Sequence, residues 1–348
     1  MSAKILTVVG ARPQFIKAAA VSRAIADVEG MNEVLVHTGQ HFDAGMSEIF
    51  FDELSIPAPH YNLEVHGGLH GDMTGRMLAK LETVMVEEKP DVVLVYGDTN
   101  STLAGALAAS KLGIKLAHVE AGLRSFNRAM PEEINRVVAD HVSNLLFCPT
   151  RTAIANLSQE GIVDGVHAVG DVMYDSTLYA IERAKGSSTI LSDMELEAES
   201  YALTTVHRAE NTDDPKRLAK VIDWLKEQAS LMPVVMPLHP RTKAAVEKHG
   251  LSLDGIKLCD PVGYLDMTQL ISNSKCVYCD SGGLQKEAYF HRKPCVTLRE
   301  ETEWVETIEC GWNRLWSEPD YLPRREIHEY GEGKSAEMIA AIIQRSLN

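Results

Sequence analysis

Continuous apolar runs alternate with helix-like stretches along the whole chain. The runs at residues 5–9, 92–96 and 145–148 contain almost no polar side chains, which is typical of strands buried on both faces of a parallel sheet. Between such runs, residues 101–112 have the composition of a helix, and Gly113 follows at the point where a helix would end. The pattern predicts an α/β fold in which helices cover parallel sheets.

The apolar runs form two series, which predicts two Rossmann-like domains. The first series comprises residues 5–9, 33–37, 92–96, 116–119 and 145–148, and the second comprises residues 201–206, 234–238, 256–259, 276–279 and 295–298. We expect an N-terminal domain at 1–170 and a C-terminal domain at 171–348, because the second series starts after Gly170. Residues 336–347 are expected to form a helix whose end packs back on the first domain.

Composition and charge disfavour several classes of partner. Lys and Arg total 34 against 49 Asp and Glu, so the formal net charge is −15. Nucleic acids and anionic membranes require basic faces, so neither is expected as the main partner. No apolar run reaches the roughly 20 residues that span a bilayer. The first residues, MSAKILTVVGARP, are interpreted as a strand rather than a signal peptide, and with six cysteines this predicts a reducing, cytoplasmic setting.

Two segments have some features of a metal site. Cys276 and Cys279 match C-x-x-C, but in a strand residues three apart point to opposite faces, and no second pair has zinc-like spacing. The loop 37–47, HTGQHFDAGMS, holds two histidines and an acid but no i,i+4 histidine pair on a helix. We therefore expect no metal, and we expect the loop to contact a sugar or to lie between the domains.

Short charged or glycine-rich motifs follow the apolar runs in both halves. They read GARPQFIK, YGDTNST, HVEAGLRS and MPEEINR in the first half, and TVHRAEN, LHPRT and DSGGLQKE in the second. Open parallel sheets bind ligands beyond the carboxyl ends of their strands. The motifs therefore predict one cleft between the two domains, and their basic residues suit a small anionic ligand.

The motif GARPQFIK predicts a phosphate contact. Arg12 and Lys17 lie where a glycine turn leads into a helix, whose N-terminus attracts anions. A surface arginine and an amphipathic lysine are the structural alternative.

The motif DSGGLQKE also predicts a phosphate contact. Ser281, Gly282 and Gly283 follow a strand and let the backbone approach a phosphate, unless Ser281 is only a helix cap. Glu287 then falls within the helix, where its carboxylate can accept hydrogen bonds from ribose hydroxyls. Near two other strand ends, His207, Arg208 and His239 are candidates for phosphate or sugar contacts.

Three carboxylates from successive elements are candidates for proton transfer. Asp98 and Glu120 follow two strands, and Glu132 lies just after Pro131 at the start of a helix. Asp98 can also be a helix cap, and acidic residues favour a helix N-terminus in any case. If the three converge, burial and mutual repulsion raise some of their pKa values, as proton transfer near neutral pH requires.

As an ordered set, these motifs resemble those of the non-hydrolysing UDP-N-acetylglucosamine 2-epimerases. The resemblance runs from GARPQFIK and HTGQHFD to DSGGLQKEAYFHRKPCVTLREETEW, nearly the whole chain. The segments GARPQFIKA, HTGQHFDAGMSEIFF and HGGLHGDMTGRML are similar to a subgroup that acts on UDP-2,3-diacetamido-2,3-dideoxy-glucuronate.

The resemblance implies a GT-B-like fold of two Rossmann-like domains with the active site in the cleft between them. It implies a homodimer that inverts C2 of a UDP-2-acetamido sugar by eliminating and re-adding UDP, with no cofactor or metal. The sugar and the carboxylates belong to the first domain in this scheme, and UDP to the second. The positions that match catalytic residues of the family are Asp98, Glu120, Glu132 and His207. Those that match or adjoin its substrate and UDP contacts are Arg12, Lys17, Arg136, Arg208, His239, Ser281, Gly282, Gly283 and Glu287, with Arg299 and Thr302 as further candidates.

The chain also departs from the family pattern. Gln40-His41 is followed by Phe42-Asp43, whereas many members activated by a second UDP-N-acetylglucosamine carry Q-H-x-x-Q. His239-Pro240-Arg241 replaces a common H-P-N. Substrate activation at a separate site and the contacts of His239 therefore stay open.

Two other functions are compatible with a UDP site on this fold. One is a GT-B glycosyltransferase, which would not need Asp98, Glu120 and Glu132 together. The other is a regulatory protein that binds a nucleotide sugar without turnover. A serine hydrolase, a classical NAD enzyme and a P-loop ATPase lose support, because the chain lacks G-x-S-x-G, a G-x-G-x-x-G after the first strand, and the Walker lysine loop.

Overall fold

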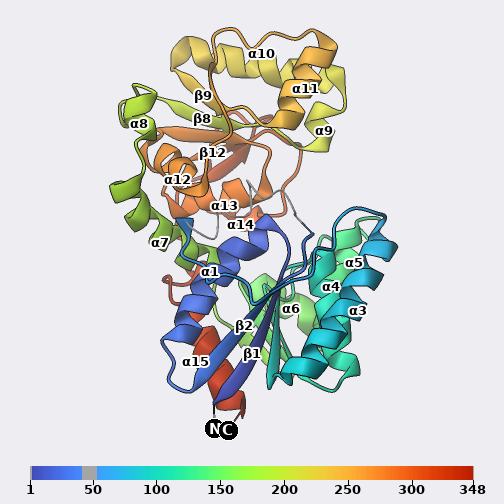
Figure 1. Cartoon of the computed structure of the whole chain (residues 1–348). Coiled ribbons are helices and arrows are strands. Elements are labelled where there is room, and N and C mark those ends of the chain that lie inside the picture. Colours follow the sequence, from blue (N-terminus) through green and yellow to red (C-terminus); the bar gives the residue numbers. More distant parts are fainter. Residues whose placement is uncertain (1, 41–52, 348) are drawn as a thin grey trace. The chain divides into compact units, whose positions relative to one another are not determined.

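A computed structural model describes residues 2–40 and 53–347 and divides the chain into two compact units (Figure 1). Unit 1 comprises Met1–Ser176 and His328–Asn348, and unit 2 comprises Thr177–Ile327. The division falls inside helix α7 (Val172–Ser187). The chain returns to unit 1 before its last helix, α15 (Ser335–Leu347).

Unit 1 is built on a seven-stranded parallel sheet with the order β3-β2-β1-β4-β5-β6-β7. The strands are β1 (Ala3–Val9), β2 (Met31–His37), β3 (Tyr61–Asn62), β4 (Val92–Tyr96), β5 (Lys115–Val119), β6 (Leu145–Cys148) and β7 (Val166–Ala168). Every residue of β4 is buried, as its unbroken apolar sequence predicts.

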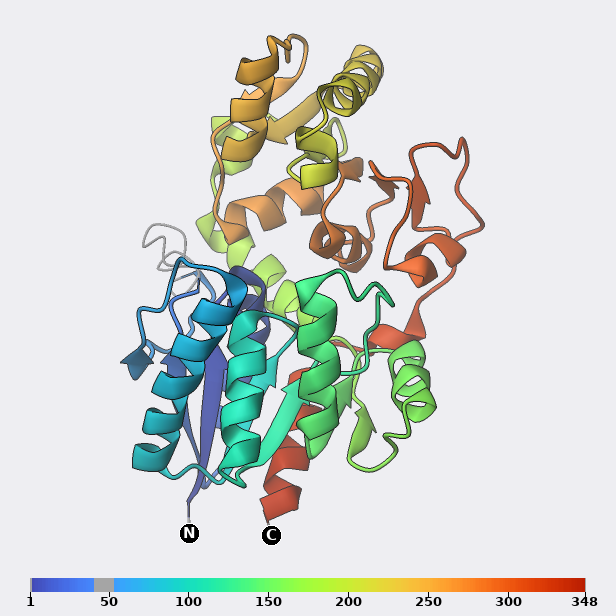
Figure 2. The same ribbon diagram turned by 90° about the vertical axis from the view of Figure 1, so that its right-hand side faces the viewer.

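Helices cover both faces of this sheet. The remaining helices of unit 1 are α1 (Arg12–Ala26), α3 (His70–Glu88), α4 (Asn100–Lys111), α5 (Pro131–Val142), α6 (Arg151–Gln159) and the short 3₁₀ helix His328–Tyr330. Figures 1 and 2 show α3, α4 and α5 side by side on one face, and α15 beside α1 on the other. Leu81 of α3 and Ala104 of α4 share an apolar core with Val93 of β4.

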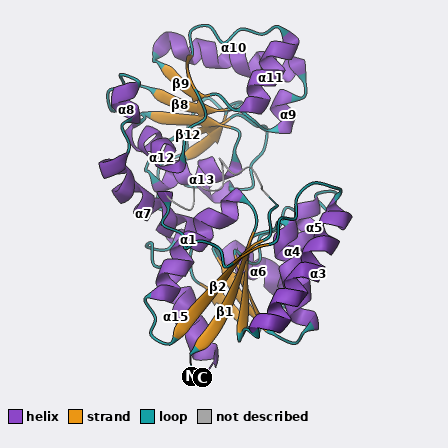
Figure 3. Ribbon diagram, in the orientation of Figure 1, coloured by secondary structure: helices purple, strands orange, loops and turns teal. Residues whose placement is uncertain are grey.

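Unit 2 is built on a six-stranded parallel sheet with the order β10-β9-β8-β11-β12-β13. Its strands are β8 (Ala202–Thr205), β9 (Val234–Pro237), β10 (Lys257–Cys259), β11 (Cys276–Cys279), β12 (Cys295–Thr297) and β13 (Asn313–Leu315). Its helices are α8 (Ile190–Asp193), α9 (Ala209–Thr212), α10 (Pro215–Leu231), α11 (Pro240–His249), α12 (Tyr264–Asn273), α13 (Gly282–Phe290) and α14 (Val305–Glu309). Figure 3 shows the strands of each unit enclosed by helices, so the predicted α/β architecture with two parallel sheets is confirmed.

Residues of β11 alternate between two apolar cores. Tyr278 packs in the core that contains Leu225 of α10, and Cys276 lies against the same core. Cys279 packs in the other core, with Leu270 of α12. The expectation that the two cysteines of C-x-x-C point to opposite faces of the sheet is therefore confirmed.

The strand order of each unit reverses direction at one point. In unit 1 the reversal lies between β1, which is followed by Gly10, and β4, which is followed by Gly97. In unit 2 it lies between β8 and β11, which are followed by Val206 and Asp280. Ligands of doubly wound folds bind at the carboxyl ends of the strands at such points. No helix in the described part of the chain is long and apolar enough to cross a membrane.

Candidate functional site

A buried ion pair lies at the reversal point of unit 1. Lys17, on the second turn of α1, pairs with the carboxylate of Glu120, which follows β5, and the two side chains are only 10% and 13% exposed. Glu120 has a φ of 71°, in the left-handed region that non-glycine residues rarely adopt. A Cβ added to Gly97 would lie 3.2 Å from Glu120 Oε2 and 3.5 Å from Lys17 Nζ. The ion pair therefore lies against the turn that carries Asp98.

Asp98 forms a second ion pair, with Arg136 of α5. Burial by itself lowers the pKa of the Arg136 guanidinium, but the negative charges of Asp98, Glu133 and Glu120 raise that pKa overall. Glu120 and Asp98 thus both act on the same guanidinium. We call Lys17, Asp98, Glu120 and Arg136 the carboxylate cluster.

The two glutamates at the start of α5 have different surroundings. Glu133 is buried and accepts hydrogen bonds of 2.9 Å from the N–H and hydroxyl of Ser125 and from the N–H of Phe126. Burial raises its pKa, but these hydrogen bonds and Arg136 outweigh burial and hold the pKa below its usual value. Glu132 is exposed, and in the described part of the chain no hydrogen bond or ion pair joins it to the carboxylate cluster. Glu133 is thus a structural residue that fixes the loop before α5.

The motif GARPQFIK contains a fixing residue that sequence interpretation missed. Arg12 begins α1 and is partly buried. Gln14 is buried, and its Oε1 accepts hydrogen bonds from the N–H groups of Gly10 and Ala11 at 2.8 and 3.0 Å. Its Nε2 donates to the carbonyl oxygen of Tyr96 at 2.9 Å. Gln14 therefore ties the turn after β1 to the end of β4.

A second group of residues that the sequence did not reveal lies behind Glu120. Asp140 of α5 accepts hydrogen bonds from His118 Nδ1 at 2.7 Å, the N–H of Gly122 at 3.0 Å and Arg124 at 2.7 Å. These three partners lie two residues before, two after and four after Glu120. Burial raises the pKa of Asp140, but His118 and Arg124 outweigh it and hold the pKa below its usual value. One ionised carboxylate thus anchors both sides of the turn that carries Glu120.

In unit 2, Asp280 organises the end of β8. It is fully buried and accepts hydrogen bonds from the N–H groups of His207 and Arg208, at 2.9 Å each to Oδ2, and from Asn211 at 3.0 Å. The rings of His207 and His239 stack with their centroids 5.1 Å apart. The structure therefore places the ring of His207 against that of His239, and one carboxylate fixes the backbone of both His207 and Arg208. Asp280 itself was missed, although its place between a buried strand and Ser281-Gly282 is a usable signal.

The N-terminus of α13 has a closed side and an open side. Ser281 occupies the N-cap position, but its side chain makes no capping hydrogen bond. A Cβ on Gly282 would lie 2.2 Å from Glu303 Oε1, whereas the nearest atom to one on Gly283 would be 4.0 Å away. Glu287, further along the helix, accepts a hydrogen bond from the Tyr264 hydroxyl at 3.2 Å. The open side exposes the backbone at Gly283, as a phosphate contact requires.

The two further candidates in unit 2 bind other protein groups. Arg299 is largely buried and pairs with Glu210 at 3.0 Å and with Glu303 at 2.7 Å. Thr302 donates to Gln285 Oε1 at 2.6 Å. Glu303 also lies 3.7 Å from Arg208, so these residues join the loop after β12 to the start of α9.

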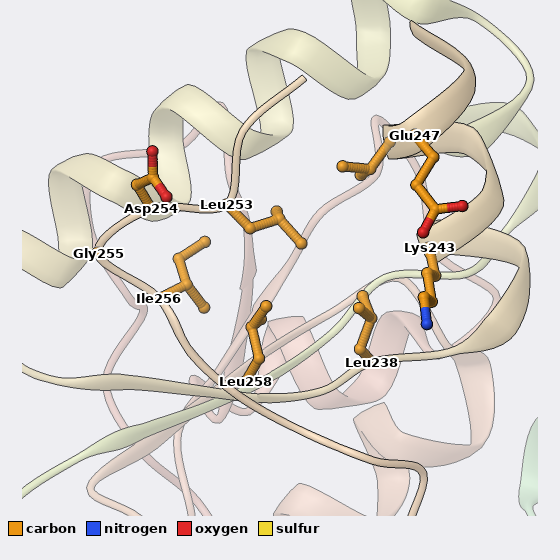
Figure 4. A pocket seen from close by; sticks show the side chains of 9 residues that line it. Leu238, Lys243, Glu247, Leu253, Asp254, Gly255, Ile256 and Leu258 are labelled. Carbon is orange, nitrogen blue, oxygen red and sulfur yellow. The ribbon is translucent and has the colours of Figure 1, made fainter. Parts of the chain in front are cut away.

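A hollow in unit 2 is lined by none of the predicted site residues, and the described residues form no metal site. The hollow in Figure 4, of about 410 Å³, lies between α11 and β10, and its lining, which includes Leu238, Leu253 and Leu258, contains none of the predicted site residues. Within residues 2–40 and 53–347, no group of three His, Cys, Asp or Glu side chains is placed to hold a metal ion. Most of the loop HTGQHFDAGMS, from His41 onward, lies outside the described residues.

Comparisons with known proteins agree on one family. The family model described as UDP-N-acetylglucosamine 2-epimerase matches residues 23–344. A UDP-2,3-diacetamido-2,3-dideoxy-D-glucuronate 2-epimerase of Pseudomonas aeruginosa is 57% identical over 316 residues, which cover 90% of this chain and 88% of that protein. A UDP-N-acetylglucosamine 2-epimerase homolog of Methanococcus maripaludis is 52% identical over 358 residues, with coverage of 98% and 99%.

A solved structure is similar along the whole chain. The crystal structure of Methanocaldococcus jannaschii UDP-GlcNAc 2-epimerase in complex with UDP-GlcNAc and UDP has a TM-score of 0.86 at 41% identity, covering 99% of this chain and 100% of that one. With the match to the family model and the identities above, this shows that the chain belongs to the UDP-N-acetylglucosamine 2-epimerase family.

Proposed function

We propose that this protein inverts C2 of a UDP-linked 2-acetamido sugar by eliminating UDP and adding it back. The observation that carries this proposal is the carboxylate cluster at the reversal point of unit 1, in a chain that belongs to a family of 2-epimerases. Such a cluster supplies basic and acidic groups in a partly buried setting, which is what proton transfer to and from carbon requires.

The chemistry explains why both carboxylates and cations are needed. C2 of the sugar is not next to a carbonyl, so direct loss and return of its proton is very unfavourable. In the elimination, a base takes the C2 proton, and the electron pair of the C2–H bond forms a C1–C2 double bond. The C1–O bond breaks at the same time, and UDP leaves with the electron pair of that bond. The resulting 2-acetamidoglycal is protonated at C2 on its other face, and UDP re-adds at C1.

Each group of residues has a role in this scheme. Asp98, Glu120 and Glu132 are proposed as the acids and bases on the two faces of the ring. Arg12, Lys17, Arg136, His207, Arg208 and His239 are proposed to bind the substrate and stabilise the leaving diphosphate. Ser281, Gly282, Gly283 and Glu287 are proposed to hold the phosphates and the ribose of UDP. Removing one preorganised contact of this kind commonly costs ~2.7–4 kcal/mol in the transition state.

We propose the 2,3-diacetamido uronate as the preferred sugar. The support is the 57% identity to the Pseudomonas aeruginosa enzyme named for that substrate, against 41% to the enzyme crystallised with UDP-GlcNAc. We further expect a homodimer that acts in the cytoplasm; all six cysteines are free, as is usual in a reducing compartment.

The decisive experiment is incubation with the UDP-sugar in deuterated water, followed by NMR of the product. We expect the C2 epimer with deuterium at C2, because the proton removed exchanges with solvent before the glycal is protonated. An epimer that retains its original hydrogen at C2 would exclude the elimination route. Sugar transfer to an added acceptor without epimer would instead identify a glycosyltransferase.

The same assay decides the substrate. Turnover of UDP-N-acetylglucosamine and of its 2,3-diacetamido uronate analogue is compared at equal enzyme concentration. We expect kcat/KM to be at least tenfold higher for the uronate. A preference for UDP-N-acetylglucosamine would overturn this assignment and leave the reaction type intact.

A further inference from the structure

Unit 2 contains a pocket of about 430 Å³ at the edge of its sheet opposite the motifs described above. Lys275 lies just before β11, Lys293 just before β12, and Glu199 shortly before β8. His207 and Ser281 follow the other ends of β8 and β11. Because the strands are parallel, the pocket and these motifs lie at opposite edges of the sheet.

The lining of this pocket is strongly basic. Its charged residues are Lys275, Arg292, Lys293, Arg314, Arg324 and Glu199, five cations and one carboxylate. The whole chain carries a formal charge of −15, yet this lining has four more positive than negative side chains. We call this region the basic pocket.

Two of the five cations are neutralised by protein carboxylates, and three are not. Lys293 pairs with Glu199, and Arg292 pairs with Glu326 at 2.5 Å. In the part of the chain that the structure describes, Lys275, Arg314 and Arg324 have no carboxylate partner. Arg314 donates instead to main-chain carbonyls, at 3.2 Å to Leu315, and its Nε is buried without a hydrogen-bond partner.

Two of the unneutralised cations, Lys275 and Arg314, lie close to Cys276 in the pocket lining. Burial raises the pKa of the Cys276 thiol, and the two positive charges partly offset that rise. Arg314 also lies over the ring of Tyr321, 5.3 Å from its centroid. Tyr278 and Tyr321 complete an aromatic wall beside the positive charges. The C-terminal end of α10 supplies Gln228 and Met232 to the same lining.

We infer that the basic pocket binds a small polyphosphate anion, at a site separate from the proposed UDP-sugar site. Arginine and lysine side chains that face one cavity are suited to phosphate oxygens, and arginine in particular binds them with two parallel hydrogen bonds. An anion there relieves the repulsion among Lys275, Arg314 and Arg324. The volume accommodates inorganic pyrophosphate, and Tyr278 and Tyr321 could pack against the base of a nucleoside diphosphate.

Methyl NMR of the full-length protein tests this inference at the pocket itself. Methionine methyl groups are labelled with ¹³C, and the signal of Met232 is identified by its loss in Met232→Leu. Inorganic pyrophosphate is titrated in, and the Met232 signal is expected to shift saturably. Arg324→Ala and Lys275→Ala remove exposed side chains and should each raise the midpoint at least tenfold. Lys216→Ala makes the same charge change at the other end of α10 and should leave the midpoint unchanged.

Two results would overturn the inference. One is the absence of a saturable Met232 shift. The other is a midpoint that is the same in Arg324→Ala, Lys275→Ala and Lys216→Ala, which would mean general attraction of anions. A thermal scan distinguishes a structural role of the cations from a binding role. If the cations only complement the C-terminal end of α10, their removal lowers the Tm measured without pyrophosphate. The rise in Tm that pyrophosphate causes is then no smaller than in the wild type. A binding role predicts an unchanged or higher Tm without pyrophosphate and a smaller rise with it.

Discussion

His118 Nδ1 lies 2.7 Å from Oδ1 of Asp140, and His118 Nε2 lies 2.7 Å from the carbonyl oxygen of Gly97. Both ring nitrogens therefore face oxygen acceptors. The histidine joins the anchor of Glu120 to the turn that carries Asp98. Two of the proposed acid–base residues are thus held in place by one buried hydrogen-bonded chain.

Asp140→Asn tests how much this chain stabilises the protein. The amide keeps one acceptor but loses the charge that faces His118 and Arg124, so the buried Arg124 keeps only Glu160 as a charged partner. Breaking a buried ion pair by removing one partner typically costs about 3–5 kcal/mol. We expect a loss of that size in the free energy of unfolding, measured in urea. Asp164→Asn, an exposed site in the same unit, should change it by less than about 0.5 kcal/mol.

The stability difference between the wild type and Asp140→Asn should depend on pH. The folded state holds the pKa of Asp140 below the ordinary value of 3.8, so its ionised form stabilises the fold above that value. As the pH falls below 3.8 and through the lower folded pKa, this contribution is lost. The stability difference between the wild type and Asp140→Asn should therefore shrink in strong acid. A difference that is constant down to the acid unfolding transition would contradict the assignment.

Much of the fold could be predicted from the sequence, because buried parallel strands are unbroken apolar runs. Residues 145–148 and 276–279 coincide with β6 and β11, each of which has a paired strand on both sides. The edge strands β3 and β13 were not predicted. Tyr61-Asn62 and Asn313-Arg314-Leu315 are short and mostly polar, so their pairing depends on the adjacent strand rather than on their own composition.

The candidate site could be predicted only in part, for a related reason. Asp98 and Glu120 could be picked out as candidates from the sequence, because each is a charged residue just after a long apolar run. The residues that hold them were not visible. Asp280 bonds to the N–H of His207 across 73 positions of the chain, and Asp140 bonds to His118 across 22. Such partners are determined by the sheet order, which periodicity does not give.

Glu120→Gln tests the proposed acid–base role. Glutamine keeps the size of the side chain, but it cannot accept a proton or pair with the charge of Lys17. General acid–base catalysis typically contributes 10²–10⁴-fold, so we expect kcat to fall by at least about 100-fold. UDP affinity, measured by calorimetry, should stay within about threefold. Glu29→Gln, an exposed control in the same unit, should retain full turnover; near-normal turnover of Glu120→Gln would remove Glu120 from the catalytic set.

Asp280→Asn tests whether the end of β8 must be rigid for UDP binding. The carboxylate accepts from His207, Arg208 and Asn211, whereas an amide turns one of its two acceptors into a donor that faces other donors. Leaving a buried group unsatisfied costs about 1–3 kcal/mol. We expect a loss of stability in that range and at least a tenfold rise in the Kd for UDP. Asp260→Asn, an exposed site in the same unit, serves as the control, and an unchanged Kd in Asp280→Asn would show that His207 and Arg208 do not act through this anchor.

Gly282→Ala and Gly283→Ala form a matched pair that separates packing from ligand approach at the start of α13. The new Cβ at position 282 meets Glu303 Oε1 at 2.2 Å, and Glu303 is held by Arg299, so overpacking should cost about 1–3 kcal/mol of stability.

The new Cβ at position 283 meets nothing closer than 4.0 Å, and alanine is the better helix former, so the Tm of Gly283→Ala should stay equal or rise. If the diphosphate of UDP approaches this exposed backbone, the same methyl group obstructs it. We therefore expect Gly283→Ala to weaken UDP binding at least tenfold in calorimetry while its unfolding curve matches the wild type. Wild-type affinity in Gly283→Ala would place the diphosphate elsewhere, and wild-type stability in Gly282→Ala would show that Glu303 moves freely.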